Sequence, residues 1–527
     1  MKKMLLLAGI VLGFSIAGNA QNPTLKFKVK GVKDTDVHLA YYFGNKLFYS
    51  DTARADKDGN FVFGTKKTYE PGVYAVVLPG TKFFEIVLNN ENVVMSTDTT
   101  DMYGHMVVTK SKENQLFYDY IHFINERRKE SEPLREKMKT ADPKSKEYED
   151  LKNQLNALDK KVKEKQATLF NDNPTSLTAK VIRMSVDVEI PEAPKNADGS
   201  PKDSLFAYKF AKAHYWDHVD FKDPSLVRCT FFHNKLENYF KNMVVQDPDS
   251  MIAESDRLIG QMLDNKDMFK YTVHYLTYTF ESSKIMCMDA AFVHLAYKYY
   301  KTGKAFWLEE DKVKKIVERA EELSPILCGV VAHPLSLPDS NMVWRRLPDV
   351  KADFTLLIFW DPECGHCKKE MPKFAELYKR LKGQGLEIYS VSSDHNEKWK
   401  KFIRDNDMQF INVAVPEKVY SDQDMAREWI TTGKTDLKSL NYRTTFDIYS
   451  TPKVFLLDKD KRIIAKQIEA EQAEKLFEFH MKKLGKTVNL NKTEEKPKEE
   501  APKKEEKKNP EPAKDKTKKE PKQKQSK

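Results

Sequence analysis

The chain has 527 residues, of which 40% are hydrophobic and 32% charged, and its mean hydropathy is −0.65. This length indicates three or four domains, and the charge content excludes a membrane protein with many spans. The formal net charge is +10, but the last 37 residues hold 14 lysines against 9 acidic residues and supply half of it. The rest of the chain lacks the basic excess expected of a nucleic-acid-binding protein.

The first twenty residues have the three-part layout of a secretory signal peptide. Lys2 and Lys3 precede an apolar run of 14 residues from Met4 to Ala17, and small residues follow it before Gln21. The run is shorter than the roughly 20 residues that a membrane-spanning helix needs. We predict a signal peptide at 1–20 and export to the periplasm or cell envelope; the segment is either cleaved or kept as an anchor.

Residues 21–110 are predicted to form an antiparallel β-sandwich or barrel. Apolar residues alternate with polar ones, which is the pattern of half-buried strands, and turn residues such as Asp58-Gly59 and Pro71-Gly72 separate the runs. The expected strands lie at 25–29, 37–41, 61–63, 73–78, 83–88 and 93–95.

Residues 111–335 are predicted to form an all-α domain, because apolar residues such as Leu151, Leu155 and Leu158 recur at helical spacing between charges. His214 and His218 stand four apart on one expected helix face. No third ligand is evident, so we predict packing there and no metal site.

Residues 336–487 alternate strands with helices, which indicates an α/β domain. The expected strands are 354–360, 386–392, 410–415, 454–457 and 463–466, and the expected helices are 364–382, 397–404 and 471–484. Residues 488–527 are rich in Lys, Glu and Pro with almost no apolar residues, so this tail is predicted to be disordered.

The five cysteines fall into two groups. Cys229, Cys287 and Cys328 lie in apolar surroundings and are predicted to be buried thiols with a structural role, because so few cysteines do not form a disulfide framework in a chain this long. Cys364 and Cys367 form a Cys-x-x-Cys pair flanked by charged residues, at the junction between a buried strand and a helix.

That position favours redox chemistry. The unpaired N–H groups of a first helical turn stabilise a thiolate, so Cys364 is the predicted nucleophile. Cys367 lies one turn further on the same face, where it can attack a mixed disulfide and release the partner. A zinc site would need two further ligands, and a disulfide across three residues constrains the unfolded chain little. A peroxidase would need Thr three positions before its reactive cysteine, where this chain has Asp361.

The run from Phe359 to Pro372 and the later Tyr449-Ser450-Thr451-Pro452 resemble the thioredoxin superfamily, and within it the TlpA/ResA-like exported thiol-disulfide oxidoreductases. The first 335 residues resemble the β-domain and helical domain of unknown function that precede such modules in secreted bacterial proteins. The resemblance implies a thioredoxin-like fold for residues 336–487, with no cofactor beyond the redox-active pair Cys364–Cys367.

The resemblance also implies supporting roles. Pro452 is expected to be cis and to lie beside the cysteines, with the Thr451 backbone pairing with a substrate strand. Trp360 is expected to form an aromatic wall, and Pro372 to kink the helix. Glu363 either modulates the pair or is a solvated turn carboxylate. Gly365 and His366, which separate the cysteines, match protein disulfide isomerase and favour a potential above the roughly −270 mV of thioredoxin.

The sequence therefore predicts a thiol-disulfide oxidoreductase of the cell envelope, acting as reductase or isomerase. Its expected partners are protein dithiols and disulfides, together with a membrane or periplasmic redox protein that resets the pair. The alternative is a non-enzymatic envelope protein that holds a partner through its first two domains and uses the thioredoxin-like fold as a platform.

Overall fold

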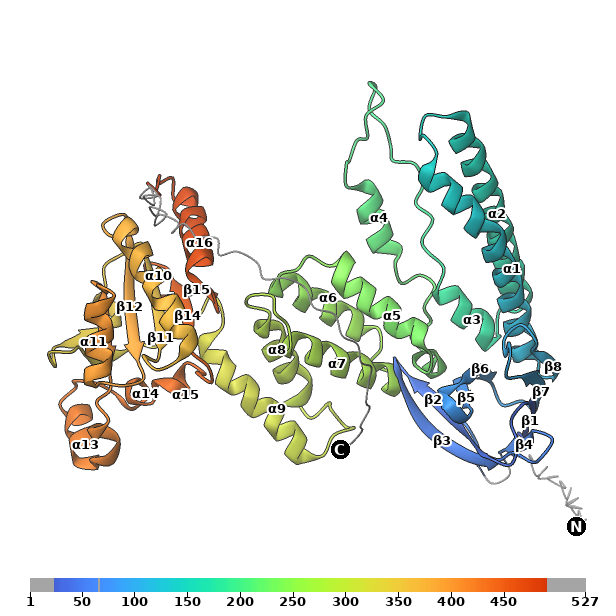
Figure 1. Ribbon diagram of the computed structural model, residues 1–527, viewed down its shortest axis with the longest axis horizontal. Helices are drawn as coiled ribbons and strands as arrows, with labels where there is room; N and C mark the ends of the chain where they lie inside the picture. Colours follow the sequence, from blue (N-terminus) through green and yellow to red (C-terminus); the bar gives the residue numbers. More distant parts are fainter. Residues whose placement is uncertain (1–22, 65–66, 491–527) are drawn as a thin grey trace, which may run out of the picture.

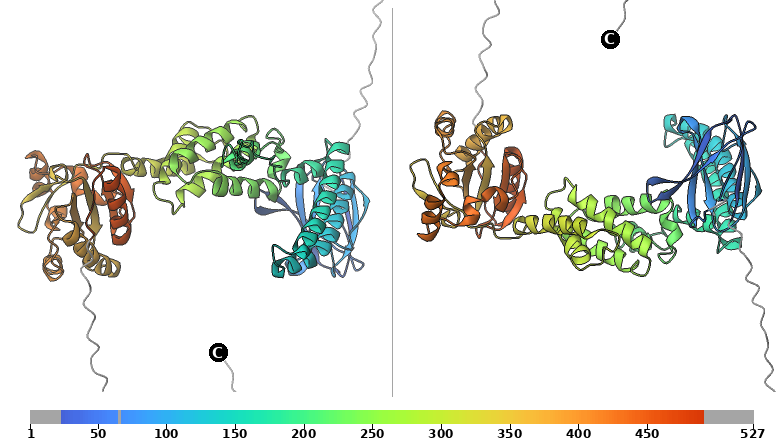
Figure 2. Two further views of the ribbon diagram at one scale, coloured as in Figure 1. Left: turned by 90° about the horizontal axis from the view of Figure 1, so that it is seen from above. Right: turned by 90° about the horizontal axis from the view of Figure 1, so that it is seen from below.

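The computed structural model describes residues 23–64 and 67–490. These residues form a β-sandwich, a helical region and an α/β domain arranged in a row (Figure 1), and the two further views show the same extended order (Figure 2). This confirms the predicted three-part fold. The predicted signal peptide at 1–20 and the predicted tail from residue 491 onward lie outside the described residues. None of the described helices has the length and apolar character needed to span a membrane.

The β-sandwich consists of two four-stranded sheets, ordered β4-β1-β7-β8 and β3-β2-β5-β6. Strand pairs are antiparallel, as predicted, except that β1 and β7 run parallel. Apolar residues such as Phe27, Phe61 and Phe84 fill the space between the sheets, so alternate residues of β1 are buried. The strands are β1 (Leu25–Lys30), β2 (Asp36–Phe43), β3 (Lys46–Arg54), β4 (Asn60–Phe63), β5 (Gly72–Val77), β6 (Phe83–Leu88), β7 (Val93–Asp98) and β8 (Val107–Lys110).

The helical region begins with a long hairpin of α1 and α2, which projects away from the row of domains in Figure 1. Ser111 and Ser145 cap the N-termini of these two helices through their side chains. Helices α5 to α9 pack around a buried core. The helices are α1 (Lys112–Thr140), α2 (Lys146–Asp172), α3 (Leu177–Met184), α4 (Phe206–His214), α5 (Thr230–Asn238), α6 (Pro248–Gly260), α7 (Lys266–Glu281), α8 (Asp289–Leu295) and α9 (Glu310–Leu323).

The α/β domain is built on a five-stranded sheet with the order β13-β12-β11-β14-β15. Strands β11, β12 and β13 are parallel, while β14 and β15 are antiparallel to their neighbours. Helices α10, α11 and α16 pack on one face of the sheet, and α12 to α15 pack on the other. The strands are β11 (Phe354–Trp360), β12 (Leu386–Ser392), β13 (Ile411–Ala414), β14 (Lys453–Leu457) and β15 (Ile463–Lys466), preceded by the short hairpin β9 (Ser336–Pro338) and β10 (Trp344–Arg346). The helices are α10 (Gly365–Leu381), α11 (Glu397–Asp405), α12 (Lys418–Ser421), α13 (Gln423–Thr431), α14 (Leu437–Leu440), α15 (Tyr442–Thr445) and α16 (Ala470–Lys483).

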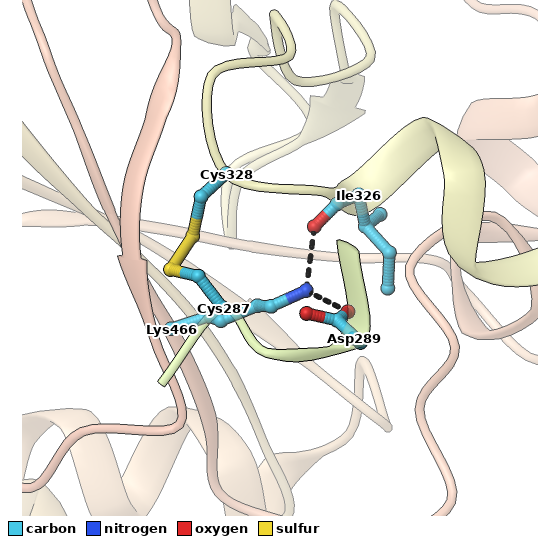
Figure 3. Close-up of a disulfide and its surroundings, with 5 residues drawn as sticks. All are labelled: Cys287, Asp289, Ile326, Cys328 and Lys466. Atoms are coloured by element: carbon cyan, nitrogen blue, oxygen red, sulfur yellow. Dashed lines mark hydrogen bonds and ion pairs between the residues drawn. A yellow bond between two sulfur atoms is a disulfide. The ribbon is translucent and has the colours of Figure 1, made fainter. Parts of the chain in front are cut away.

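The contact between the helical region and the α/β domain is named here the C-terminal junction. Beside this junction, Cys287 in the loop before α8 and Cys328 in the linker after α9 form a disulfide (Figure 3), so the prediction that both are free thiols is wrong. They are 41 residues apart in sequence but have Cα atoms 5.7 Å apart, because the chain returns to the start of α8 after α9. Beside the disulfide, Lys466 of β15 forms an ion pair with Asp289 and donates to the carbonyl oxygen of Ile326 (Figure 3).

The connection into the α/β domain also closes one edge of its sheet. The Gly329 N–H donates to the Ile463 carbonyl oxygen at 2.7 Å, and the Ile463 N–H donates to the Val330 carbonyl oxygen at 2.9 Å. The linker therefore pairs with β15 as a short extra strand would. Together with the disulfide, these bonds fix the α/β domain to the helices.

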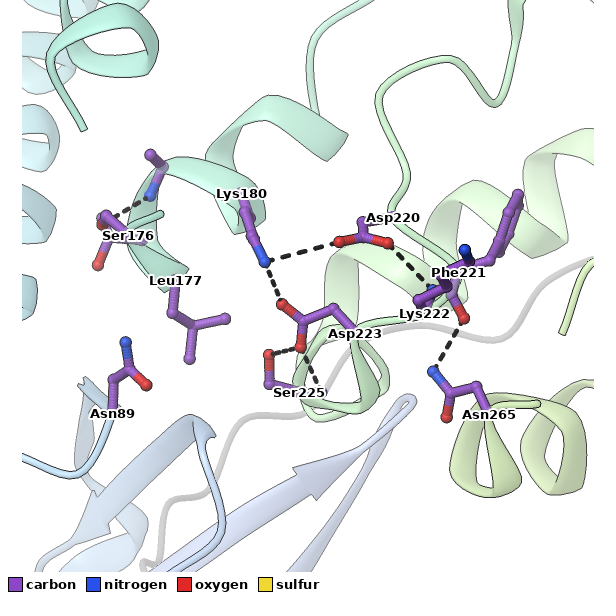
Figure 4. A network of polar contacts seen from close by, with 12 residues as sticks. Asn89, Ser176, Leu177, Lys180, Asp220, Phe221, Lys222, Asp223, Ser225 and Asn265 are labelled. Carbon is purple, nitrogen blue, oxygen red and sulfur yellow. Dashed lines mark hydrogen bonds and ion pairs between the residues drawn. The ribbon is translucent and has the colours of Figure 1, made fainter. Parts of the chain in front are cut away.

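The contact between the sandwich and the helical region is named here the N-terminal junction. On the helical side of this junction, Lys180 of α3 lies 2.6 Å from Asp223 and 3.6 Å from Asp220, so these contacts order the helical region itself (Figure 4). The Gly44 N–H, at the tip of the β2–β3 hairpin, donates to the Val227 carbonyl oxygen at 2.8 Å. Phe43 of β2 also meets the ring of Tyr271 on α7 at 5.5 Å, so this junction is held by backbone hydrogen bonds and by aromatic packing.

Candidate functional site

The Cys-x-x-Cys pair lies where the central strand β11 gives way to helix α10. Strand β11 is buried along its whole length, and the chain turns at Asp361 to Cys364. Cys364 has an extended backbone and is the N-cap residue of α10, and Cys367 lies in its first turn. The pair is thus at the carboxyl end of a central strand and the amino end of a helix.

Cys364 is the more accessible cysteine of the pair. Its side chain is partly exposed, and its Sγ donates to the carbonyl oxygen of Thr451 at 3.4 Å. The backbone N–H of Cys367 is the main cause that lowers the pKa of the Cys364 thiol, and the N–H of His366 adds to it, while partial burial opposes both. These are the unpaired N–H groups of the first helical turn, which point toward the sulfur and favour the anion.

Cys367 has the opposite environment. Its side chain is buried, and burial raises the pKa of its thiol to about 11. The Asp361 N–H donates to its Sγ at 3.5 Å. One sulfur is therefore partly exposed with a lowered pKa, while its neighbour is buried and protonated near neutral pH.

Strand β14 brings a second loop to the cysteines. It lies antiparallel to β11, with Phe359 opposite Lys453, so the residues before β14 reach the N-terminus of α10. The Thr451–Pro452 peptide bond is cis. The structure thus brings together Cys364, Cys367, Thr451 and Pro452, which are about 85 positions apart in the chain.

The other predicted site residues lie at different depths. Trp360 is buried, and its indole N–H donates to Ser390 Oγ at 3.3 Å, so it belongs to the core behind the pair and not to an open wall. Gly365 and His366 are exposed. Glu363 is exposed as well, and its carboxylate forms an ion pair of 2.6 Å with Lys398.

A charged cluster supports the Thr451–Pro452 loop, and the sequence did not reveal it. Asp447 is buried between Lys453 of β14 and Arg319 of α9, which belongs to the helical region. The Arg319 guanidinium also lies 5.7 Å from the ring centre of Tyr449, whose side chain is 80% exposed. Arg319, which is 128 positions from Asp447 in the sequence, therefore holds this loop in place. No local sequence pattern predicts such a contact.

A buried carboxylate on α10 was missed as well. Glu370 is 4% exposed and lies three residues, or about one turn, after Cys367. Its Oε1 accepts from Lys373 Nζ at 2.6 Å, but its Oε2 is buried without a hydrogen-bond partner. Glutamate is rarely buried without full pairing, so this carboxylate is an unusual feature of the helix that carries the cysteines.

Comparison with known families divides the chain in the same order as the fold. Residues 328–466 match the AhpC/TSA family. Residues 23–117 and 144–323 match two domains of unknown function, DUF4369 and DUF5106.

Individual proteins resemble the C-terminal part. The thiol-disulfide oxidoreductase ResA of Bacillus thuringiensis subsp. konkukian is 31% identical over 140 residues, which cover 26% of this chain and 68% of that protein. ResA of Bacillus subtilis is 26% identical over 153 residues, which cover 29% and 73%. A solved domain of a possible thiol-disulfide isomerase from Cytophaga hutchinsonii is 32% identical, covers 31% of this chain and 98% of its own, and has a TM-score of 0.25. Through its C-terminal domain, the chain belongs to the ResA family of thiol-disulfide oxidoreductases.

Proposed function

We propose that this protein exchanges disulfides with protein substrates in the cell envelope through Cys364 and Cys367. The observation that carries the proposal is the contrast between the two sulfurs: one is accessible with a lowered pKa, and the other is buried with a raised pKa. A reductase needs this arrangement, because the first sulfur must attack the substrate disulfide as a thiolate. The second sulfur must stay protonated until the mixed disulfide has formed.

In the first step, the Cys364 thiolate attacks one sulfur of a substrate disulfide. A bond forms between Cys364 Sγ and that sulfur, the substrate S–S bond breaks, and the departing substrate thiolate takes a proton. The N–H groups at the start of α10 stabilise Cys364 before attack. The exposed loop at Thr451 offers backbone groups beside the reacting sulfur, where an extended substrate segment is proposed to pair.

In the second step, Cys367 loses its proton and attacks Cys364 Sγ. A Cys364–Cys367 disulfide forms, and the second substrate sulfur leaves as a thiol after protonation. The substrate disulfide gains two electrons, and the enzyme dithiol loses two. The proton that Cys367 gives up balances the one that the departing substrate sulfur takes. A separate dithiol protein of the envelope would reduce the pair again.

Two observations support an envelope location. The first twenty residues have the layout of a signal peptide. The Cys287–Cys328 disulfide is of the kind that forms and persists in oxidising compartments. Fractionation of cells that express the full chain tests this: we expect a shortened, mature protein outside the cytoplasm, and a full-length cytoplasmic protein would contradict the proposed location.

The activity is tested by insulin reduction in the presence of dithiothreitol. The purified protein should accelerate precipitation of the insulin B chain, and Cys364→Ser should abolish the acceleration. Cys229→Ser is the matched control, since Cys229 is a free cysteine that is fully buried away from the pair. Equal activity of wild type and Cys364→Ser would refute the assignment. Cys367→Ser should accumulate mixed disulfides, from which mass spectrometry can identify substrates.

A further inference from the structure

A large cleft lies at the N-terminal junction, far along the chain from the cysteines. Its floor is one face of the sheet β3-β2-β5, and its wall is helix α7 with the segment at Trp307. Its volume is about 1110 Å³, above the roughly 300–1000 Å³ of small-molecule sites. In Figure 1 the β2–β3 hairpin reaches from the sandwich toward α7.

The cleft has an aromatic lining. Nine of the twenty residues that line it are tyrosine, phenylalanine or tryptophan. They come from both sides: Tyr41 stacks on Phe48 in the sheet at 5.5 Å, and Tyr271 and Tyr275 lie parallel on α7. Tyr278 at the rim is 65% exposed. Aromatic surfaces of this kind bury apolar side chains of a ligand, and exposed tyrosine hydroxyls can form hydrogen bonds with it.

The charges of the cleft favour an anionic ligand. Lys46 of β3 and Lys270 of α7 both line it, and neither pairs with a carboxylate within the described residues. Burial lowers the pKa of the His274 imidazole, and the positive charges of Lys46 and Lys270 lower it further. The carboxylate of Asp267, in contrast, is already paired with Arg228 at 2.5 Å.

The floor ends at an open strand edge. Strand β3 is the last strand of its sheet, and within the described residues no strand pairs with its outer edge. Its first four residues are exposed, and among them Leu47, Phe48 and Tyr49 are large apolar residues. An exposed apolar edge is a template for an added strand, and every second side chain of such a strand would point to the same face as Phe48.

The wall and the floor are held at a fixed separation. Gly44, at the hairpin tip, has φ +61°, and a Cβ there would overlap the ring of Tyr271. The hairpin thus rests directly on α7, which a side chain at this position would prevent. The contact between the hairpin and α7 therefore fixes the width of the cleft.

We propose that this cleft binds an extended segment of an unfolded polypeptide substrate, one that carries aromatic and acidic side chains. The segment adds as a strand to the open edge of β3, and its alternate side chains enter the cleft. Main-chain bonds to the edge give affinity, and the aromatic and lysine side chains select the sequence. This rests on the proposed function, since an enzyme that acts on protein disulfides gains from holding an unfolded chain nearby.

The test uses a probe without thiols, reduced and carboxymethylated α-lactalbumin, added to the full-length protein. Fluorescence anisotropy should show binding of this unfolded chain and none of native α-lactalbumin. Tyr278→Ala and Lys270→Glu, which alter the cleft lining, should each weaken binding by about tenfold. Hydrogen exchange at residues 46–49 should slow when the probe is bound, because an added strand occupies their backbone groups.

Matched controls lie in the same sheet and on the same helix. Phe83→Ala changes an exposed aromatic residue of β6 that does not line the cleft, and Lys266→Glu changes a lysine of α7 one turn before Lys270. Both should leave binding within twofold of wild type. No binding of the probe, equal losses in lining and control variants, or unchanged exchange at residues 46–49 would each overturn the proposal.

Enzyme assays separate this proposal from the proposed function. A Cys364→Ser, Cys367→Ser double variant should bind the probe as wild type does, because the probe cannot react; loss of binding there would place the site at the cysteines and refute the cleft. Tyr278→Ala should raise the KM for an unfolded disulfide-bonded protein while leaving reduction of a small aromatic disulfide unchanged. An equal loss on both substrates would contradict a binding role for the cleft.

Discussion

The helical region meets its two neighbours in different ways. At the C-terminal junction, a disulfide ties the linker to the helices, and an ion pair and paired backbone groups join helices and linker to the α/β domain. At the N-terminal junction, backbone hydrogen bonds and aromatic packing adjoin a cleft of about 1110 Å³. The first junction leaves little freedom between helices and sheet, and the second leaves room for a ligand.

This difference assigns separate tasks to the two ends of the helical region. Arg319 of α9 reaches the loop that carries Thr451, so the C-terminal junction extends to the cysteine pair itself. The N-terminal junction lies at the other end of the row of domains (Figure 1). We therefore expect substitutions at the first to alter stability and catalysis together, and substitutions of the cleft lining at the second to alter binding.

The largest expected effect comes from removing the disulfide of the C-terminal junction. Changing Cys287→Ser and Cys328→Ser together should lower the free energy of unfolding by about 4 kcal/mol, because the cross-link closes a long loop in the unfolded chain. Guanidinium unfolding measures this. Wild type in reducing agent is the control and should match the variant; equal unfolding midpoints under oxidising conditions would contradict a disulfide-locked junction.

The buried ion pair beside it should have the next largest effect. Lys466→Met leaves Asp289 without its cation and should cost about 3 kcal/mol of stability, since a buried charge that loses its partner stays desolvated. Lys459→Met, at an exposed pair with Asp460, should cost under about 1 kcal/mol. Thermal unfolding distinguishes the two, and equal effects would show that the Lys466 pair behaves as a surface contact.

Near the N-terminal junction, Glu113 makes stability depend on pH. Burial, the largest influence, raises the pKa of its carboxyl, but hydrogen bonds from Ser176, Thr178, Asn89 and Leu177 together hold it below its ordinary value. This stabilisation is present above the unfolded pKa of about 4.3 and is lost as the pH falls through the lower folded pKa.

Glu113→Gln should therefore destabilise the protein by about 2 kcal/mol at pH 7, and the difference from wild type should shrink below pH 4. Urea unfolding at a series of pH values measures the difference. Glu126→Gln, at an exposed carboxylate on the same helix, is the control. A difference that grows in acid would give the opposite sign and contradict the assignment.

The smallest expected effect concerns Arg319, a positioning residue. Arg319→Ala should raise the KM for insulin by about threefold with little change in kcat, because Asp447 keeps its bond to Lys453 and the loop shifts only slightly. Arg319→Lys should recover part of the loss, and Lys315→Ala, at an exposed site on α9, should have no effect. A fall in kcat at unchanged KM would assign Arg319 a different role.

The sequence predicts the α/β domain well because its buried segments have clear limits. Strands 354–360 and 386–392 lie as predicted, since continuous apolar runs bounded by turn residues leave little choice. The position of the cysteine pair could be predicted for the same reason, because a motif that links a buried strand to a helix lies at the end of the strand and the start of the helix.

The features that the sequence did not reveal depend on contacts between residues far apart in the chain or belong to exposed segments. Strand β3 was missed because its exposed first half lacks alternation of apolar and polar residues. Helices α12, α14 and α15 lie outside every predicted element because each has only four residues, too few for a helical period to appear. Helix α13, with nine residues, was missed as well. The Cys287–Cys328 bond was missed because its pairing depends on tertiary structure, and composition gave no hint of it.

The most direct test is the rate of alkylation of each free cysteine by iodoacetamide as a function of pH, with the Cys364–Cys367 pair reduced. Mass spectrometry of the digested protein assigns the label to Cys364, Cys367 or Cys229. The account predicts that Cys364 reacts first, with a pKa below that of an ordinary thiol, while burial keeps Cys229 and Cys367 slow and raises the pKa of each thiol to about 11. If Cys364 reacts no faster than the other two, or only at high pH, the proposed chemistry is wrong.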